Sequence, residues 1–328
     1  MSPVRALGLL SGGLDSALAA KLLLDQRLEV IGLHLASPTA CRSDVHDVAR
    51  DLGIRLEVQP KGEQYLRLLR SPRWGYGKNM NPCIDCRVFM FRAARQWLED
   101  LDADFLFTGE VVGQRPMSQR RGPMALIDRE ADLAGWILRP LSALVLPETE
   151  PERLGWVDRS RLLGIDGRGR QDQLELARRL GLRHYQSPGG GCLLTDAHFS
   201  VKLRDLFDHR SEEQTSMEDV ALLRVGRHFR VRPDLKIVLG RNREENLQLA
   251  TFARDDRWLI EPDGFNGPPA LVCGPRDESS LNEAMILIAR YTRAPQPDHQ
   301  VRWRVEGREQ RRHLGSLATR EAPIAVAC

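Results

Sequence analysis

The chain has 328 residues, enough for two domains, with 42% hydrophobic and 28% charged residues. This composition excludes disordered and fibrous proteins, and no apolar run approaches the about 18 residues of a membrane span. The N-terminus leads into an apolar strand without the features of an export signal, so we expect a cytoplasmic protein without membrane contact. The net charge is only +3. Only local clusters of basic residues therefore indicate a nucleic-acid partner.

Short apolar strands alternate with helical patterns over the first half of the chain. We expect strands at residues 4–10, 30–35, 55–58 and 104–108, and helices at 14–24, 45–52 and 88–98. This alternation predicts an α/β domain with a doubly wound parallel sheet covered on both faces. Ligands of such domains bind at the carboxyl ends of the strands.

The second half has a different character. Helical patterns cover residues 196–209 and 281–291, and from about residue 222 short β-like runs are separated by glycine and proline. We expect a second, smaller domain of the α/β or α+β class. The predicted boundaries are 1–190 for the first domain, 191–221 for a linker with a helix, and 222–328 for the second domain.

A glycine-containing turn joins the first strand to the first helix. Its residues are Ser11, Gly12, Gly13, Leu14, Asp15 and Ser16. The glycines allow a tight turn, which exposes backbone N–H groups at a helix N-terminus, where an anion binds well. Ser11 and Ser16 add hydroxyl donors, and Asp15 can hold Mg²⁺ beside phosphates. The alternative is a serine-capped turn without a ligand. No Gly-Lys-Ser/Thr follows, so this is not a Walker A loop.

The segment SGGLDS resembles the PP-loop of the ATP pyrophosphatase superfamily, whose domains have an adenine nucleotide alpha hydrolase-like fold. The resemblance implies that ATP is cleaved between its α and β phosphates and that AMP is placed on a substrate oxygen. It also implies that Leu33 and His34, at the end of the second strand, cradle adenine. Thr108 and Gly109, after the fourth strand, would line the same site.

Three cysteines stand in suggestive contexts. Cys83 and Cys86 form a Cys-x-x-Cys pair ahead of a helical pattern, and Cys192 ends a proline- and glycine-rich loop. Four interpretations stay open: a zinc site completed by His184 or His198, a redox pair that carries a persulfide, a [4Fe–4S] cluster with three thiolate ligands, and inert buried thiols. Cys41, Cys273 and Cys328 lack a motif and are expected to be small hydrophobic residues.

Further segments resemble enzymes that thiolate tRNA. Residues 81–86 (NPCIDC) look like the cysteine motif of tRNA 2-thiouridine synthases, whereas residues 108–119 (TGEVVGQRPMSQ) and 138–141 (LRPL) look more like 4-thiouridine synthetases. The Cys-x-x-Cys pair with a distant third cysteine resembles iron–sulfur-dependent tRNA thiolases. This likeness implies that Cys83, Cys86 and Cys192 hold a [4Fe–4S] cluster whose open iron binds sulfide. The likeness covers residues 5–195. The given sequence departs from the 4-thiouridine synthetases because it does not contain their N-terminal RNA-binding extension.

Basic residues gather in two places. One group follows residue 222: Arg224, Arg227, His228, Arg230, Arg232, Lys236, Arg241 and Arg243. The other surrounds the expected site: Arg73, Lys78, Arg87, Arg92, Arg95, Arg115, Arg120 and Arg121. Either group could contact RNA phosphates, and a solvated arginine-rich face is the alternative for the first. Residues 236–259 resemble the RNA-binding domain of NFACT proteins through Gly240-Arg241-Asn242, Asn246 and Asp256-Arg257-Trp258.

Together these features predict an ATP-dependent tRNA sulfurtransferase. ATP with Mg²⁺ would adenylate a uridine carbonyl oxygen, and sulfur at the three cysteines would replace it. We expect 4-thiouridine, with 2-thiouridine as an alternative. The expected partners are tRNA and a sulfur donor, either sulfide or a cysteine desulfurase persulfide, and a homodimer is an open alternative to a monomer. Two other classes remain as competing hypotheses: a PP-loop ligase that forms a C–N bond on a small molecule, and a nucleic-acid-binding protein with an inactive loop.

Overall fold

The computed structural model describes residues 3–40, 45–185, 192–305, 307–319 and 326–327. The chain divides into two units, Met1–Thr195 and Asp196–Cys328. The domain boundaries predicted from the sequence, 1–190, 191–221 and 222–328, stay a prediction. Within the described ranges, every helix is too short or too polar to cross a membrane.

The first unit alternates strands and helices along the chain. Its strands are β1 (Arg5–Leu9), β2 (Glu29–Ala36), β3 (Arg55–Pro60), β4 (Phe105–Thr108) and β5 (Ile137–Leu138). Its α-helices are α1 (Leu14–Leu24), α2 (Val45–Leu52), α3 (Gly62–Arg70), α4 (Cys83–Asp100), α5 (Arg121–Glu130), α6 (Glu150–Arg153) and α7 (Gln171–Arg179). Short 3-10 helices occupy Ala143–Val145, Arg159–Arg161 and Leu193–Thr195. The expected helix at 88–98 is longer than predicted because it begins at Cys83, so the cysteine pair lies in its first turn.

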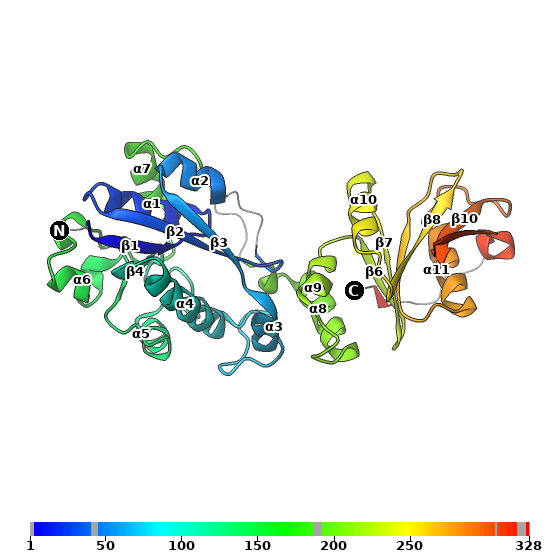
Figure 1. Cartoon of the computed structure of the whole chain (residues 1–328), viewed down its shortest axis with the longest axis horizontal. Coiled ribbons are helices and arrows are strands. Elements are labelled where there is room, and N and C mark those ends of the chain that lie inside the picture. Colours follow the sequence, from blue (N-terminus) through cyan, green and yellow to red (C-terminus); the bar gives the residue numbers. More distant parts are fainter. Residues whose placement is uncertain (1–2, 41–44, 186–191, 306, 320–325, 328) are drawn as a thin grey trace. The chain divides into compact units, whose positions relative to one another are not determined.

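The five strands form one parallel sheet in the order β3-β2-β1-β4-β5. Helices α1, α2 and α7 cover one face, and α4 and α5 cover the other (Figure 1). Buried alanines and leucines of α1 pack on the first face, and Val88, Phe91 and Ile127 pack on the second. The predicted doubly wound α/β fold is confirmed. From β1 the chain adds β2 and β3 on one side and then β4 and β5 on the other, and this reversal of strand order leaves a crevice at the carboxyl ends of β1 and β4.

The second unit is built on an antiparallel sheet. Its strands are β6 (Arg227–Arg232), β7 (Leu235–Leu239), β8 (Arg257–Asp263), β9 (Ala270–Cys273), β10 (Gln300–Val305), β11 (Arg308–His313) and β12 (Val326–Ala327), in the order β11-β10-β8-β9-β7-β6-β12. Its helices are α8 (Ala197–His209), α9 (Met217–Leu222), α10 (Arg243–Thr251) and α11 (Glu278–Arg290), with a 3-10 helix at Gly315–Thr319. The unit is therefore of the α+β class, one of the two classes expected.

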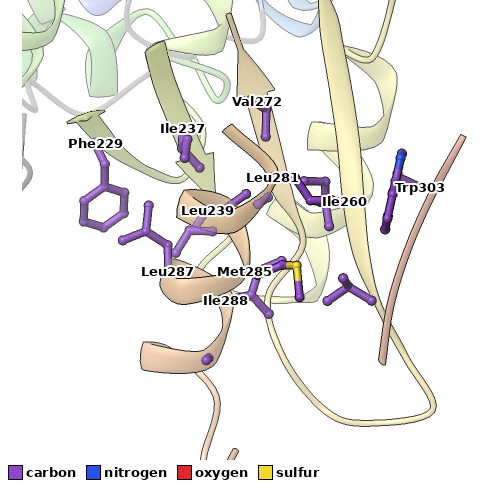
Figure 2. Close-up of a cluster of buried hydrophobic side chains, with 14 of the residues drawn as sticks. Phe229, Ile237, Leu239, Ile260, Val272, Leu281, Met285, Leu287, Ile288 and Trp303 are labelled. Atoms are coloured by element: carbon purple, nitrogen blue, oxygen red, sulfur yellow. The ribbon is translucent and has the colours of Figure 1, made fainter. Parts of the chain in front are cut away.

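Helix α11 supplies the main core of this unit. Figure 2 shows Leu281, Met285, Leu287 and Ile288 of α11 among apolar side chains of the sheet, such as Ile237. A second cluster, which includes Leu222 of α9 and Leu249 of α10, covers Val238 and Leu271. All five residues of β7 are buried, because this central strand is covered on both faces.

A buried ionic group attaches α8 to the sheet. The Asp205 carboxylate accepts two hydrogen bonds from Arg230, each 2.9 Å, and one from Lys236 at 2.8 Å. Burial would raise the pKa of Asp205, but these two cations lower it to about 2. His228, next to Arg230 on β6, is also buried, and its pKa lies well below the usual value, first because of burial and then because of Lys236. The imidazole is therefore neutral.

These contacts correct the predicted basic face after residue 222. His228 and Lys236 are buried, Arg230 and Lys236 are both paired with Asp205, and Arg241 is paired with Glu245. Arg232 lies beside Asp234. Of the eight residues, Arg227 and Arg243 are exposed and have no ionic partner among the residues that the structure describes. The sequence cluster is therefore largely a set of internal ion pairs, because the acidic partners come from distant or intervening positions.

Replacing Asp205 by asparagine is expected to destabilise the chain by about 3 kcal/mol, since two buried cations then lose their common carboxylate. The full loss of stability is expected at neutral pH. It should shrink as the pH falls from about 4 toward 2, because the ionised form of Asp205 then disappears in the wild type as well. Urea unfolding of both proteins between pH 2 and pH 7 measures the difference. Asp208→Asn, an exposed change on the same helix, is the control and should leave stability within about 0.5 kcal/mol.

Candidate active site

The turn between β1 and α1 is held in shape by its own serines. Ser16 Oγ donates to Gly13 O at 2.9 Å, and it accepts from Ser11 N at 3.3 Å. Gly13 N donates to Ser11 Oγ at 3.3 Å. Gly12 has a φ of +74°, which favours glycine. The expected phosphate-binding turn thus has a preformed geometry at the N-terminus of an 11-residue helix.

Asp15 lies in the first turn of α1 with one oxygen unused. Its Oδ2 accepts from Gln114 Nε2 at 3.1 Å, whereas its buried Oδ1 has no hydrogen-bond partner within the described residues. Burial raises the pKa of Asp15, and Gln114, Arg170 and Arg115 only partly oppose this rise. A buried carboxylate oxygen without a partner is costly for the protein alone. This arrangement fits a bound Mg²⁺ ion, which prefers carboxylate and phosphate oxygens.

One pocket of about 970 Å³ contains nearly all the site residues expected from the sequence. This volume is at the upper end of the roughly 300–1,000 Å³ typical of small-molecule sites. The expected residues that line it are Ser11, Gly13, Asp15, Ser16, Leu33, His34, Cys83, Cys86, Thr108, Gly109 and Cys192. Gly12 is buried in the turn and does not line the pocket. His34 is oriented by a 2.8 Å contact between its Nδ1 and Leu10 O.

Three segments that surround the cysteines are joined by backbone contacts. Asn79 Nδ2 donates to Thr195 O at 2.7 Å, and Met80 N donates to Leu194 O at 3.2 Å. Leu193 N donates to Thr39 O at 3.1 Å. Asn79 has a φ of +57°, in the left-handed region that asparagine tolerates better than most residues. The loop before α4, the loop after β2 and the segment after Cys192 therefore meet at the pocket.

The three thiols have different partners. Cys86 Sγ lies 3.5 Å from Lys61 Nζ and 3.4 Å from the Tyr65 hydroxyl, and Lys61 Nζ lies 4.3 Å from the centre of the Tyr65 ring. Burial would raise the pKa of the Cys86 thiol, but Lys61, Tyr65 and Arg87 outweigh burial and lower it. Cys86 is therefore the thiol best suited to react as a thiolate.

Cys83 and Cys192 each donate a hydrogen bond to an oxygen acceptor. Cys83 is buried and donates to Ser118 Oγ at 3.0 Å, and Cys192 donates to Thr39 O at 3.3 Å. The pKa of Tyr65 is raised first by burial and then by negative charge on Cys86 and on Cys192. Cys86, Cys192 and Tyr65 all line the same pocket.

The predicted [4Fe–4S] cluster at these thiols stays a prediction. Their sulfurs have separate partners, and the structure brings no three His, Cys, Asp or Glu side chains together as a metal site within its described part. Among the described residues neither His184 nor His198 joins such a group, and the zinc interpretation also stays a prediction. Residues 186–190 and Gly191, most of the glycine-rich loop before Cys192, lie outside the described residues, as do Cys41 and Cys328.

A buried ionic network explains two of the sequence motifs structurally. Glu110 of the TGE turn lies 3.2 Å from Arg87 of α4 and 3.1 Å from Arg139, which follows β5. Arg139 also donates two hydrogen bonds to Asp128 of α5, at 2.8 and 2.7 Å. Burial would lower the pKa of Arg139, but Asp128 and Glu110 raise it. Glu110 and the arginine of LRPL thus fix the walls of the pocket.

The second group of basic residues is divided by its partners. Arg73 and Arg92 lie against Glu130, and Arg95 is paired with Asp132. Lys78, Arg87 and Arg115 line the pocket. Arg121 donates to the carbonyl of Val145, and Arg120 is exposed. Only part of this group is therefore available to an RNA ligand.

Comparisons with known proteins agree with the two-unit architecture. Residues 4–132 match the model of the tRNA methyl transferase HUP domain, and residues 226–322 match that of the NFACT protein RNA binding domain. The first unit, whose Ser11–Ser16 turn resembles a PP-loop, is similar to this HUP domain over residues 4–132 and is called the PP-loop domain below. The predicted resemblance to PP-loop tRNA thiouridylases and to the NFACT domain is confirmed.

Curated relatives are similar to part of the PP-loop domain. A tRNA-specific 2-thiouridylase MnmA of Syntrophotalea carbinolica is 36% identical over 115 residues, which are 30% of this chain and 32% of the relative. The MnmA of Symbiobacterium thermophilum is 32% identical over 134 residues, 34% of each chain. The chain thus spans about a third of the length of these relatives.

Two solved structures align at low similarity. A crystal structure of a 4-thiouridine synthetase–RNA complex with bound ATP shares 21% identity at a TM-score of 0.39, over 67% of this chain and 52% of that chain. An NMN synthetase from Francisella tularensis shares 13% identity at a TM-score of 0.35, over 67% and 83% of the two chains.

The PP-loop domain also uses residues that sequence reasoning missed. Lys61, Tyr65, Gln114, Arg168 and Arg170 line the pocket or contact its functional groups. Lys61 was one of only five lysines in the chain, which was the one available signal for it. Arg168 and Arg170 are far from the motifs in the sequence, and no local pattern distinguishes them.

Gly109 is required for the PP-loop to lie where it does. A Cβ atom on Gly109 would lie 2.4 Å from the backbone C of Asp15 and from the backbone N of Ser16. Gly109→Ala is therefore expected to displace the loop and weaken ATP binding by at least about 10-fold, with a loss of stability of about 1–3 kcal/mol. Isothermal titration and thermal unfolding measure the two effects. Gly122→Ala, where a Cβ meets no atom within 4 Å, should change neither.

Proposed function

We propose that this chain is an ATP-dependent tRNA thiouridine synthase. The observation that carries the proposal is the pocket that joins a PP-loop to three cysteines, one of them beside Lys61 and Tyr65. A C–N ligase would not need a thiol with a lowered pKa in the pocket that holds ATP. The unused oxygen of Asp15 argues for an active loop and against the inactive one.

ATP would enter with its phosphates at the PP-loop and its adenine toward Leu33 and His34. The N-terminus of α1 favours the phosphate charge, and Ser11 and Ser16 hold the turn open for it. Thr108 and Gly109 close the adjacent side after β4. When bound, Mg²⁺ would neutralise phosphate charge, and Asp15 is the residue that would hold it.

In the first step a uridine carbonyl oxygen attacks the α phosphorus of ATP. The bond from the α phosphorus to the bridging oxygen breaks, pyrophosphate leaves with the electron pair, and the uridine N3 proton passes to solvent. The uridine then carries AMP on its former carbonyl oxygen. To reach the pocket the base must leave its stack, which costs a few kcal/mol.

In the second step sulfur replaces that oxygen. We propose that Cys86 carries a persulfide received from a donor, because Lys61 stabilises negative charge at this sulfur. The terminal sulfur attacks the activated carbon, and AMP leaves with the electron pair. Cys192, which lines the same pocket, then attacks the sulfur of Cys86, which forms a disulfide and releases the thiouridine. A dithiol reductant must reduce this disulfide before the next cycle.

We propose that the second unit captures tRNA. Its match to the NFACT protein RNA binding domain supports this role. In the first unit, Lys78 and Arg120 are exposed basic residues that would add phosphate contacts.

The position of the sulfur has two candidates. The names of the curated relatives favour C2, and the segment 108–119 favours C4. We propose 2-thiouridine first, because the C2 relatives share 32–36% identity over the PP-loop region. 4-Thiouridine is the second candidate.

The test combines nucleotide products with nucleoside analysis. With tRNA and a persulfide donor, the protein is expected to form AMP and pyrophosphate and to add one sulfur to a uridine. Mass spectrometry of the digested tRNA against both thiouridine standards identifies the position. Formation of ADP and phosphate, or AMP without any thiolated nucleoside when the donor is active, would refute the proposal.

A further inference from the structure

Two loops beside the PP-loop are locked to each other by their backbones. Val112 and Asp166 form a parallel bridge, and Gly167 N donates to Val112 O at 2.7 Å. Gly113 has a φ of +80°, and a Cβ atom there would lie 3.2 Å from Gly167 N. The backbones of the loops 112–115 and 166–170 are therefore in direct contact.

A buried serine fastens the same two loops to the domain. Ser142 is fully buried, its Oγ accepts from Val112 N at 3.0 Å, and it donates to Ile165 O at 2.6 Å. Ile165 N donates to Leu141 O at 2.8 Å. A shared anchor of this kind holds both loops in one fixed geometry.

This pair of loops presents three arginines to the pocket. Arg115, Arg168 and Arg170 all line it. No carboxylate in the described part of the chain pairs with them, whereas Arg87 and Arg139 in the same domain are each paired with an acid. Three cations without a direct ion pair on a rigid support favour a polyanion as their ligand.

The position of the arginines indicates which anion. Gln114, from the same loop as Arg115, donates to Asp15 Oδ2. Arg115 directly follows Gln114 in the chain, and Arg168 and Arg170 line the same pocket as Asp15. The cationic loops therefore lie next to the residue of the PP-loop that would hold Mg²⁺.

We propose that Arg115, Arg168 and Arg170 form a clamp for the pyrophosphate that leaves ATP, an assignment that rests on the proposed adenylation at this site. When the bond from the α phosphorus to the bridging oxygen breaks, negative charge builds up on the departing β phosphate. Guanidinium groups bind phosphate oxygens through paired, charge-assisted hydrogen bonds. Because the loops are fixed in advance, they need little rearrangement as this charge develops.

The test is inorganic pyrophosphate itself, on the full chain. Arg170→Gln and Arg168→Gln remove one charge each with a side chain of similar length. Each is expected to weaken pyrophosphate binding in calorimetry, and pyrophosphate inhibition of AMP formation, by about 10- to 100-fold. Arg170→Lys should recover part of this loss. Arg50→Gln, an exposed arginine on α2 that does not line the pocket, is the matched control and should bind as the wild type does.

A second measurement separates the ligand classes. The affinity for tRNA in the absence of nucleotide should stay within about 2-fold in both glutamine variants. A fall in tRNA affinity with unchanged pyrophosphate binding would assign the arginines to the RNA backbone and overturn the clamp. If the wild type binds pyrophosphate through these arginines but forms no AMP with tRNA, the proposed function fails and the clamp stands. Equal melting temperatures of the variants exclude misfolding as the cause.

Discussion

Cys86→Ala should abolish tRNA thiolation, by roughly 1,000-fold or more, while ATP-dependent formation of AMP on tRNA continues. The two steps separate because Cys86 contacts Lys61 and Tyr65, whereas the PP-loop is shaped by Ser11, Gly13 and Ser16. Single-turnover assays that follow AMP and thiouridine in the same reaction measure both. Loss of AMP formation together with thiolation would contradict the assignment of Cys86 to sulfur transfer.

Cys273→Ala is the matched control for this variant. Cys273 is a free thiol of the second unit, and burial raises its pKa, so it should not react. Its removal should leave thiolation unchanged.

Iron analysis of anaerobically purified protein tests the [4Fe–4S] cluster that the sequence predicted. About four irons per chain, lost in Cys86→Ala, Cys83→Ala and Cys192→Ala alike, would replace the persulfide route by the cluster.

Asp15→Asn should lower AMP formation by at least about 100-fold through the loss of metal-assisted phosphate binding. Asparagine keeps the size of the side chain and an oxygen for Gln114 but removes the charge that would hold Mg²⁺. The affinity of the wild type for ATP should rise when Mg²⁺ is added and fall again with EDTA. The variant should show little response to either, as measured by calorimetry.

The same change should not unfold the protein. Burial raises the pKa of Asp15 in the folded protein. Above the usual pKa of an aspartate, the ionised Asp15 carboxylate therefore lowers the stability of the fold. At pH 7 the variant without nucleotide is therefore expected to be as stable as the wild type or slightly more stable. A large drop in its melting temperature would show that Asp15 is structural and would undermine its assignment to the metal.

Local sequence patterns predicted the fold class of the first unit, although β5, α3, α5, α6 and α7 were not expected. Apolar strands that alternate with helical patterns are typical of a parallel sheet with helices on both faces. The observed sheet, with the strand order β3-β2-β1-β4-β5, is of this type. The turn Ser11–Ser16 was predictable for the same reason, since its glycines, its serines and the following helix are contiguous. The cysteine pair was found by spacing, although the helix begins at Cys83 and not after the pair.

The charge pattern of the second unit misled because ionic partners are distant in sequence. Arg230 and Lys236 stand close to other basic residues in the chain, but both pair with Asp205, from a helix that the sequence assigned to a linker. Glu110 and Arg139 were noticed as parts of motifs, and only the fold shows that they are joined in a buried network.

The sequence by itself determined the fold of the first unit, the PP-loop and the three cysteines, because each depends on neighbouring residues. Only the tertiary structure decided which cysteine stands beside a lysine, which arginines lack an acidic partner, and that two loops more than 50 residues apart share Ser142 as an anchor. Hydrogen bonds and ion pairs form between atoms a few ångströms apart in space. Residues that are far apart along the chain can lie that close together once the chain has folded, so the sequence alone does not reveal these partners.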